Sequence, residues 1–275
     1  MTKQEKYTRL CHVLYWVVTA SFIITLIYVP IRVITDKHYR ENAEYVIMIF
    51  QTIMGLLIIN LPSFLSKRFM WKIPPMFAAC FILFLFGAIF LGEALMFYYR
   101  VPNWDNILHF FSSMMLGLLG FSLIDILNGD KKHSLVKLSP FFVCLFSISF
   151  ALFIGVLWEI YEFTFDGLLG MNMQKFAVEA LEDGEKLVDL VGREALADTM
   201  HDLIIDLAGA TIISLAGYVT TKRGKGGWLE AFRVEVGSAQ ASSAAFAENI
   251  APSCEDTPSS DRAHTSNESG NSSND

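Results

Sequence analysis

Six long apolar stretches constrain this chain more than any other feature of its sequence. They cover residues 12–34, 43–65, 75–99, 107–127, 140–163 and 199–220. Each has about the 20 apolar residues that an α-helix needs to cross a bilayer. Hydrophobic residues make up 53% of the chain, more than a soluble core of this size would bury, and the charged residues lie mostly between the stretches. The sequence therefore predicts an all-α, polytopic integral membrane helix bundle of about six transmembrane helices in contact with the lipid bilayer.

The basic residues beside these stretches indicate how the chain is oriented, because Lys and Arg are retained on the cytoplasmic side of a membrane. Alternate connections, starting with the N-terminus, carry twelve basic residues, and the remaining connections carry seven over much longer sequence. The denser set is Lys3, Lys6, Arg9, Lys67, Arg68, Lys72, Lys131, Lys132, Lys137, Lys222, Arg223 and Lys225. We therefore expect a multi-pass protein of the cell membrane with its N- and C-termini in the cytoplasm.

We expect the chain to consist of a transmembrane helical bundle over residues 1–225 and a disordered cytoplasmic tail over residues 226–275. Ser, Ala, Asn, Asp and Glu dominate the tail, which has too little apolar surface to offset its ordering entropy. The one sizeable extracytoplasmic loop, residues 164–198, is acidic, and loose helical spacing over residues 173–190 predicts a short amphipathic helix there. No basic stripe interleaved with aromatic residues is present, so we expect no nucleic-acid partner, and the sequence indicates no particular protein partner.

Ionisable residues inside the apolar stretches are the strongest functional signal, because each costs about 2.5–3.5 kcal/mol at the centre of a spanning helix. In the expected topology nine of those in or directly beside spans three to six fall at the extracytoplasmic ends, while Asp125, at the inner end of span four, is interpreted as an interfacial charge. The nine are Glu93, Asp105, His109, Glu159, Glu162, Asp198, His201, Asp202 and Asp206. Spacings of three or four residues place members of each set on one helix face. We therefore predict an outer-facing pocket where His109, Glu159 or Glu162, Asp202 and Asp206 meet.

Two kinds of chemistry fit such a pocket. Carboxylates and imidazole are ligands for divalent Zn, Mn or Fe, so His109, Glu159, Asp202 and Asp206 are candidate metal ligands. With or without that ion, His109, Glu159, Glu162 and Asp202 are candidate catalytic residues acting on a lipid or cell-envelope substrate. For Asp105 and Asp198, near predicted helix N-termini, a capping role is favoured.

The sequence leaves open whether the chain is an enzyme. Without a metal, a carboxylate beside His109 is also a proton relay, which is typical of a transporter or proton-coupled permease. A membrane scaffold or sensor that signals through its tail is a third alternative. Each of the three predicts a different consequence of altering the pocket.

Three segments carry a resemblance to a known family: residues 104–110 (WDNILHF), 158–163 (WEIYEF) and 198–210 (DTMHDLIIDLAGA). Together they resemble the YjdF-like family of bacterial inner-membrane proteins, over about residues 98–218. The aspartate followed four residues later by His-Phe is also loosely similar to the VanZ-like family. The resemblance implies a membrane-embedded bundle with these polar positions in common, and it implies no particular activity.

Overall fold

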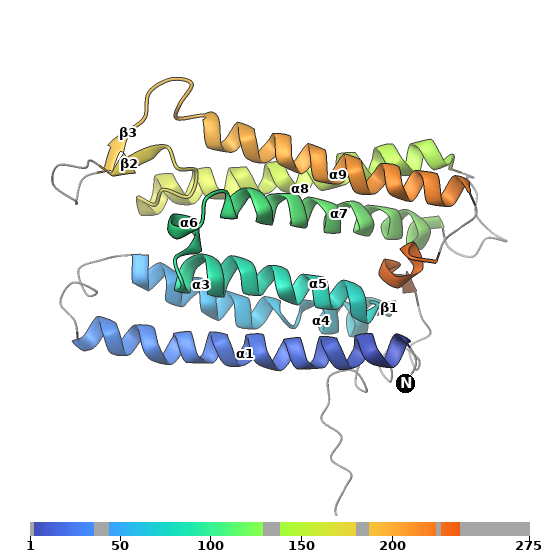
Figure 1. The fold of residues 1–275 in the computed structure, drawn as a ribbon, viewed down its shortest axis with the longest axis horizontal. Coiled ribbons are helices and arrows are strands. Elements are labelled where there is room, and N and C mark those ends of the chain that lie inside the picture. The colour runs from blue at the N-terminus through green and yellow to red at the C-terminus, as the bar shows by residue number, and fades with distance from the viewer. Residues whose placement is uncertain (1–2, 36–43, 129–137, 180–186, 224–226, 237–275) are drawn as a thin grey trace, which may run out of the picture.

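The computed structural model describes residues 3–35, 44–128, 138–179, 187–223 and 227–236, and within them long helices lie side by side (Figure 1). Six helical segments there are long and apolar enough to cross a membrane. They are Glu5–Thr35, Ile47–Phe69, Pro75–Ala94, Trp104–Ile124, Pro140–Leu169 and Ala197–Lys222. The predicted all-α bundle with about six spans is therefore confirmed.

The elements follow one another as helices joined by short turns and two small strand pairs. In order they are α1 (Lys3–Thr35), α3 (Glu44–Ile58), α4 (Leu61–Phe69), β1 (Trp71–Lys72), α5 (Pro75–Leu85), the π-helix η1 (Phe86–Ala94), α6 (Phe97–Arg100), α7 (Trp104–Asn128), α8 (Pro140–Leu169), β2 (Ala177–Glu179), β3 (Leu187–Asp189), α9 (Ala197–Lys222), the 3₁₀ helix η2 (Leu229–Phe232) and β4 (Glu235–Val236). In Figure 1, α6 and the β2–β3 pair lie at one end of the bundle, which we call the hairpin end. The N-terminus, β1 and β4 lie at the other, which we call the N-terminal end.

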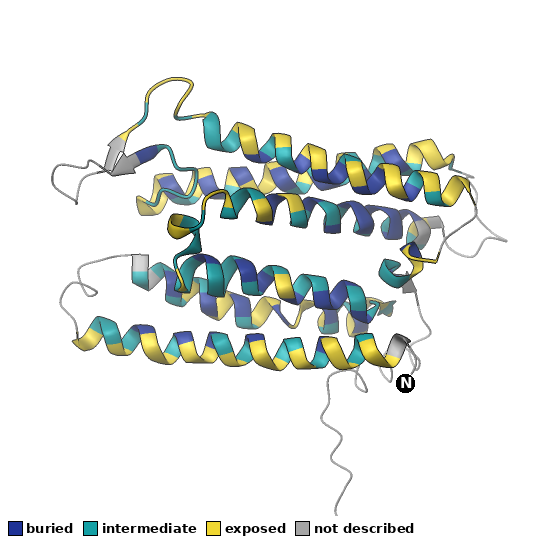
Figure 2. Cartoon of the chain, viewed as in Figure 1, coloured by how far each residue is buried: buried dark blue, intermediate teal, exposed yellow. Residues whose placement is uncertain are grey.

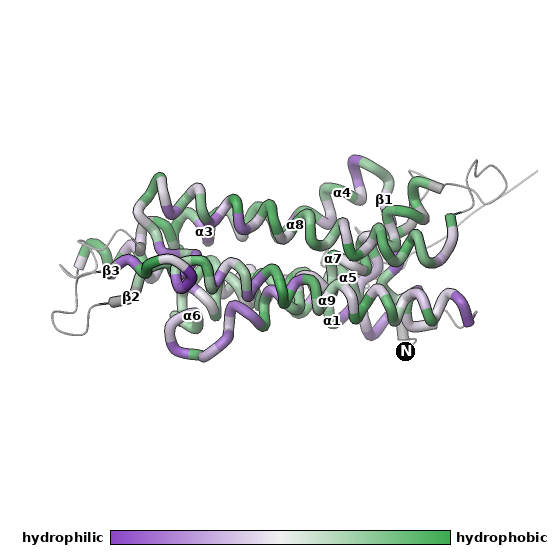
Figure 3. The backbone as a smooth tube through the Cα atoms, turned by 90° about the horizontal axis from the view of Figure 1, so that it is seen from above, coloured by the Kyte–Doolittle hydropathy of each residue, from purple (hydrophilic) through white to green (hydrophobic). Residues whose placement is uncertain are grey.

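The outer faces of the helices have the composition expected of a surface in contact with lipid. Large apolar side chains such as Ile24, Phe153 and Ile204 are 62%, 59% and 58% exposed. Figure 2 shows such exposed positions along the outward faces of α1 and α9, and Figure 3 shows apolar residues dominating the middle of the helices. In water such faces would be an aggregation hazard, whereas in a bilayer they need no partner.

The second span is interrupted, as the polar residues near its end suggest. A turn at Ile59 and Asn60 separates α3 from α4, and Pro62 stands in the first turn of α4. The Asn60 side chain donates to the Leu56 carbonyl at 2.9 Å and accepts from the Tyr15 hydroxyl at 3.1 Å. The break is therefore stabilised by polar contacts rather than left open to lipid.

The third span ends before its predicted limit at residue 99. Its last two turns form the π-helix η1, which is followed by Met96 in a left-handed conformation (φ 58°) and then by α6. Tyr98 folds back against the small Gly92, where a Cβ atom would overlap the tyrosine ring. A π-helix is rare and is often found at functional sites, and this one carries Glu93.

The fifth span is longer than predicted, because α8 continues from residue 163 to Leu169. It begins at Ser139, whose hydroxyl accepts a hydrogen bond from the Phe142 amide at 3.2 Å, with Pro140 in the first turn. It ends at Gly170, whose left-handed backbone (φ 67°) is one that glycine adopts without strain. The extension adds Asp166 to the helix, and that residue positions the loop described below.

The predicted amphipathic helix over residues 173–190 is wrong. Residues Ala177–Glu179 and Leu187–Asp189 instead form the antiparallel pair β2–β3, and residues 180–186 lie outside the described part of the chain. The Asn172 side chain donates to the Ala177 carbonyl at 2.7 Å and accepts from its amide at 3.0 Å. This double contact holds the start of β2 in an extended conformation. The spacing of apolar residues gives no sign of such a contact.

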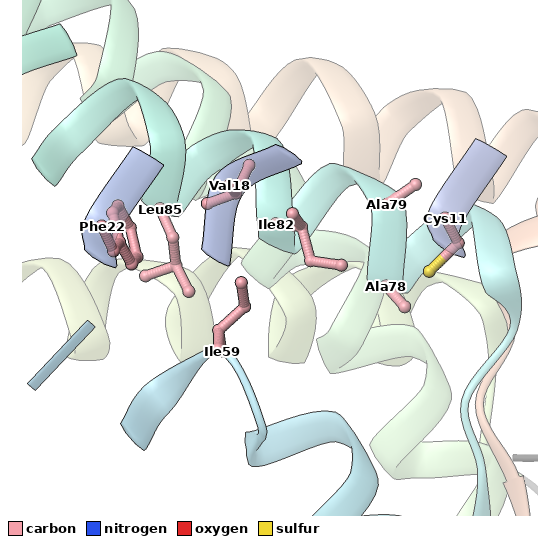
Figure 4. Packing of buried hydrophobic residues seen from close by; sticks show 8 residues of the cluster. All are labelled: Cys11, Val18, Phe22, Ile59, Ala78, Ala79, Ile82 and Leu85. Atoms are coloured by element: carbon pink, nitrogen blue, oxygen red, sulfur yellow. The ribbon is translucent and has the colours of Figure 1, made fainter. Parts of the chain in front are cut away.

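Two packing units make up the bundle. In the first, α1 and α5 enclose a cluster of apolar side chains that Ile59 completes (Figure 4). The cluster consists of Cys11, Val18, Phe22, Ile59, Ala78, Ala79, Ile82 and Leu85. The second unit consists of α7, α8 and α9, which pack against one another along their lengths. We call them the N-terminal and C-terminal halves.

A short C-terminal segment joins the two halves at the N-terminal end. β4 pairs with β1, the Val234 amide donates to the Ser122 hydroxyl of α7 at 3.0 Å, and Leu229 is buried. Residues 227–236, which the sequence assigned to the disordered tail, thus pack on the bundle. The rest of the expected tail, residues 237–275, lies outside the described residues.

Candidate functional site

Close approach of α7, α8 and α9 brings the polar residues together. At Gly209 of α9, a Cβ atom would lie 2.8 Å from the Phe110 carbonyl oxygen of α7. At Gly155 of α8, a Cβ atom would overlap the Asp206 carboxylate of α9. Small residues let helix backbones approach closely in membranes. Here they also leave room for carboxyl groups that larger residues would displace.

The resulting polar cluster lies toward the hairpin end of the C-terminal half. It consists of Asp105 and His109 from α7, Glu159 and Glu162 from α8, and Asp202 and Asp206 from α9. All but Asp105 are buried, and Asp105 is partly buried. One imidazole and five carboxyl groups therefore share a region largely closed to solvent.

His109 lies between two of the carboxylates. Its Nδ1 atom is 3.4 Å from Asp206 Oδ1, and its Nε2 atom is 3.9 Å from Asp105 Oδ1. The contact at Nδ1 favours the tautomer in which that nitrogen carries the proton. In that tautomer Nε2 is left with a lone pair directed toward Asp105.

Asp105, His109 and Asp202 form the tightest group, which we call the Asp–His–Asp trio. One ligand atom from each lies within 4.8 Å of the other two. Asp202 is fully buried (0% exposed), and neither of its oxygens has a hydrogen-bond partner among the described residues. A buried carboxylate without a partner is costly, and a bound cation is one way to compensate it.

The two glutamates of α8 lie beside the trio in different environments. Glu162 accepts a hydrogen bond from the Trp158 indole at 2.9 Å. Neither oxygen of Glu159 has a hydrogen bond of good geometry among the described residues, although Thr199 and Gln174, which bond to each other at 2.8 Å, lie close to it. Glu159 thus adds a second carboxylate without a well-formed hydrogen bond to the cluster.

Lys175 covers the cluster from the loop that follows α8. Its ammonium group donates to Asp105 Oδ2 at 2.7 Å and to Asp198 Oδ1 at 3.1 Å. Partial burial lowers the pKa of this ammonium, but the charges of Asp105 and Asp198 outweigh it and raise the pKa above the usual lysine range. Lys175 therefore remains charged under physiological conditions.

The backbone around Lys175 is held in place by Asp166. The Asp166 carboxylate accepts hydrogen bonds from the Met173 amide at 2.8 Å and from the Gln174 amide at 3.0 Å. Lys175 itself has a left-handed backbone (φ 47°), which is uncommon for a residue with a side chain. The loop is therefore positioned by α8 and directs Lys175 over the ends of α7 and α9.

A second set of contacts connects the cluster with the N-terminal half. The Trp104 indole of α7 donates to the Gly87 carbonyl of η1 at 3.2 Å, and η1 is in turn joined to α3 by Gln51, which donates to Glu93 at 3.1 Å. Tyr98 lies near Asp105 and Glu93, and burial together with these charges raises the pKa of its hydroxyl well above the usual value. Tyr98 and Trp104 thus contribute to the contact between η1, α6 and the start of α7.

A cleft of about 340 Å³ opens beside the trio at the hairpin end. Its lining includes Tyr98, Arg100, Trp104, Asp105, Lys175 and Asp198. Because Asp105 belongs to both the cleft and the trio, a molecule in the cleft would lie next to the candidate metal ligands. The volume is within the range of small-molecule sites.

The predicted site residues lie where their sequence positions suggested, in a different grouping. His109, Glu159, Glu162, Asp202 and Asp206 are all buried in the polar cluster. The tightest group, however, includes Asp105 and leaves out Glu159 and Asp206. Asp105 and Asp198 lie in the first turns of their helices, where a carboxylate is favoured, and both pair with Lys175.

Lys175 is the residue that sequence reasoning missed. A basic residue within an acidic loop was the only available signal, and nothing in its spacing connects it with Asp105, 70 positions earlier.

Comparisons with known proteins place the chain in a family. A family described as "Predicted membrane protein (DUF2238)" matches residues 14–223. The chain belongs to this family. The match covers all six membrane-spanning segments except the first turns of α1.

One curated relative is similar over part of its length. An uncharacterized protein of Thermotoga maritima is 34% identical over 132 residues, which make up 46% of this chain and 56% of the relative. The match thus spans little more than half of that relative. No solved structure matches the chain. The looser likeness to VanZ-like proteins gains no support from these findings.

Proposed function

We propose that this family member is a metal-dependent membrane enzyme that binds a divalent cation at Asp105, His109 and Asp202. The observation that carries the proposal is the convergence of three ligand atoms within 4.8 Å around the fully buried, unpartnered Asp202. Together with the three sequence motifs, the family match also supports membership of the YjdF-like group.

The surroundings of the trio suit a cation. Nδ1 of His109 faces Asp206 at 3.4 Å, which leaves Nε2 for a metal, the arrangement common in carboxylate–histidine–metal sites. Mixed oxygen and nitrogen ligands fit Zn²⁺, Mn²⁺ or Fe²⁺. Such an ion would offset carboxylate charges that the described side chains leave without a partner.

The cluster also holds the groups that hydrolytic chemistry needs. A divalent ion at the trio would supply a bound water of lowered pKa, about 7 for zinc in favourable sites. Glu159, with no hydrogen bond of good geometry to either oxygen, is placed to accept a proton, and Glu162 is oriented by Trp158. We assign the substrate to the lipid or cell-envelope class, because the cleft opens at the ends of the spans.

Metal analysis of the purified protein tests this proposal. The unmodified chain is expected to retain about one divalent ion per molecule, and the double variant His109→Ala, Asp202→Asn is expected to lose it. Asp189→Asn, which removes an exposed carboxylate of β3, is the matched control and should keep the ion. Equal metal content in all three proteins would contradict the proposal.

The extracytoplasmic location of the hairpin end remains part of the proposal. It is supported by the distribution of basic residues, since Lys67, Arg68, Lys72 and Lys222 all lie at the N-terminal end of the bundle. Single cysteines at Asp189 and Lys222 should react with an impermeant thiol reagent from opposite sides of the cell membrane. Labelling of Asp189→Cys only after the membrane is opened would reverse the orientation.

A proton-coupled permease is the second candidate, and one observation favours it. Buried and partly buried carboxyl groups continue from the trio through Glu162 to Glu93, and the charges of both glutamates act on Tyr98. Such a series could relay protons between the two halves.

The packing below the cluster argues against transport. Toward the N-terminal end, the buried polar groups described on α7, α8 and α9 are the serines Ser122, Ser147 and Ser214. At Gly120 a Cβ atom would lie 2.8 Å from the Ser147 backbone, so α7 and α8 are in direct contact at this level. Access of a cytoplasmic carboxyl reagent to Asp202 in any condition would favour the permease instead.

A further inference from the structure

Lys175 and the Asp–His–Asp trio share one carboxylate. Asp105 Oδ2 accepts from the Lys175 ammonium at 2.7 Å, while its Oδ1 atom lies on the His109 side at 3.9 Å. Asp198 provides the second anionic partner of the ammonium. In this arrangement the charge of Lys175 is neutralised by two carboxylates and is not available to another anion.

A divalent ion at the trio would change this balance. Asp105 would then share its charge with the ion, and the ion would repel the nearby ammonium. The attraction that holds Lys175 to Asp105 would weaken, although Asp198 would keep the side chain near the cleft. With its side chain 41% exposed, Lys175 has room to turn toward a molecule there.

The cleft has the position and lining of a headgroup site. It lies at the ends of the spanning helices, between α6, the start of α7 and the Lys175 loop. Its two permanent cations are Lys175 and the exposed Arg100, and Tyr98, Tyr99 and Trp104 supply aromatic surface. Lysine and arginine beside aromatic residues at this depth are suited to the phosphate of a lipid.

We propose that the cleft binds the phosphate group of an anionic membrane lipid, that Lys175 is the residue that recognises it, and that metal binding at the trio releases Lys175 from Asp105 to do so. This inference rests on the metal site proposed above. It assigns a substrate class and an order of binding, in which the metal comes first. Lys175 is a binding residue in this scheme, next to the metal and outside its ligand set.

Binding of short-chain phosphatidate to the full-length protein in detergent tests the inference. Calorimetric titrations would be run with Mn²⁺ and with a chelator, using the unmodified chain, Lys175→Met and Lys175→Arg. Removing Mn²⁺ or truncating Lys175 should each weaken binding by about tenfold or more, the usual loss of a charged hydrogen bond. Lys175→Arg should retain most of the affinity, because the positive charge is kept.

Three controls separate the sources of the effect. Lys222→Met removes a cation at the opposite end of the bundle and should leave phosphatidate binding unchanged. Short-chain diacylglycerol, which lacks the phosphate, and inorganic phosphate, which lacks the lipid, should both bind more weakly than phosphatidate. Inorganic phosphate binding as tightly as phosphatidate would overturn the assignment to a lipid.

The remaining outcomes distinguish this inference from the proposed function. If the unmodified chain holds its metal but Lys175→Met binds phosphatidate normally, the role of Lys175 is wrong and the metal site stands. If phosphatidate binds equally with and without Mn²⁺, the release of Lys175 by metal is wrong. If the unmodified chain holds no metal, both proposals fail together.

Discussion

The two halves of the molecule differ in the chemistry of their interiors, one mainly apolar and the other containing acidic and imidazole groups. In the N-terminal half, Val18, Phe22 and Ile82 are almost completely buried, and the hydroxyls of Thr25 and Thr52 bond to carbonyls of their own helices at 3.0 and 2.7 Å. In the C-terminal half, the buried set includes the acidic and imidazole groups of the polar cluster. Both halves face lipid with similar apolar surfaces, so the contrast lies inside.

This contrast indicates that the N-terminal half serves as a scaffold and that the C-terminal half holds the candidate site. In a membrane, apolar side chains and hydroxyls that bond to their own helix carry little energetic cost. Carboxylates without a partner are costly and tend to be retained where they have a function. The helix contacts also differ: a Cβ atom on Gly55 of the first half would meet the side chains of Ile89 and Phe22, whereas Gly120 and Gly209 of the second lie against the backbone of a neighbouring helix. Four substitutions test this division, and the largest effect is expected where backbones touch.

Gly209→Ala should give the largest loss of stability. Its Cβ atom would lie 2.8 Å from the Phe110 carbonyl oxygen, which belongs to a helix backbone and cannot turn aside. We expect unfolding to become easier by about 3 kcal/mol, as for an overpacked core. Thermal unfolding in detergent measures this. Gly167→Ala, with nothing within 4 Å, is the matched control; equal behaviour of the two variants would refute close helix contact.

Phe22→Ala should destabilise the N-terminal half by about 2 kcal/mol through lost packing contacts, somewhat less than in a water-soluble core. Phe22 is fully buried in the apolar cluster of Figure 4. Metal content should be unchanged, because no cluster residue lies in this half. Loss of the metal in this variant would show that the halves are not separable in this way.

Asp202→Leu should raise the stability of the metal-free protein by about 1 kcal/mol, because an unpartnered buried carboxylate is replaced by an apolar group. Added Mn²⁺ should stabilise the unmodified chain and leave this variant unaffected. Asp166→Leu is the informative contrast, since it leaves the Met173 and Gln174 amides without their acceptor and should destabilise. If both changes shift the melting temperature in the same direction, the distinction between site and scaffold carboxylates fails.

Gln51→Leu should have the smallest effect, about 0.5–1 kcal/mol, from the lost hydrogen bond to Glu93 that joins α3 to η1 within the N-terminal half. Thr52→Val, on the next residue, removes a hydroxyl bonded within its own helix and should change stability even less. A larger effect of Thr52→Val than of Gln51→Leu would show that the hydrogen bond between α3 and η1 contributes little to stability.

Much of the fold could be predicted from the sequence because apolar length and charge placement are local properties. The six spans, and the burial of His109, Glu159, Glu162, Asp202 and Asp206, followed from them. Helical spacing also placed Asp105 on the face of His109. Whether these residues hold a metal, and which side of the membrane they face, stay predictions.

What could not be predicted depends on contacts between distant segments. The π-helix that carries Glu93 is stabilised by packing against Tyr98 and Trp104. The return of Lys175 to Asp105 depends on the Asp166 contacts that fix the loop. Neither the packing of η1 nor the return of Lys175 leaves a periodic pattern in the sequence. Helical spacing therefore suggested an amphipathic helix where the chain forms β2 and β3.

The pairing of β1 with β4 has a consequence for biosynthesis. β1 follows the second span, whereas β4 is made only after the sixth, so β1 has no strand partner until the whole bundle has left the ribosome. Chains are synthesised far more slowly than helices form, so the earlier spans have time to assemble first. Closure of this small strand pair is therefore a late step, and it marks a chain whose six helices have all been inserted.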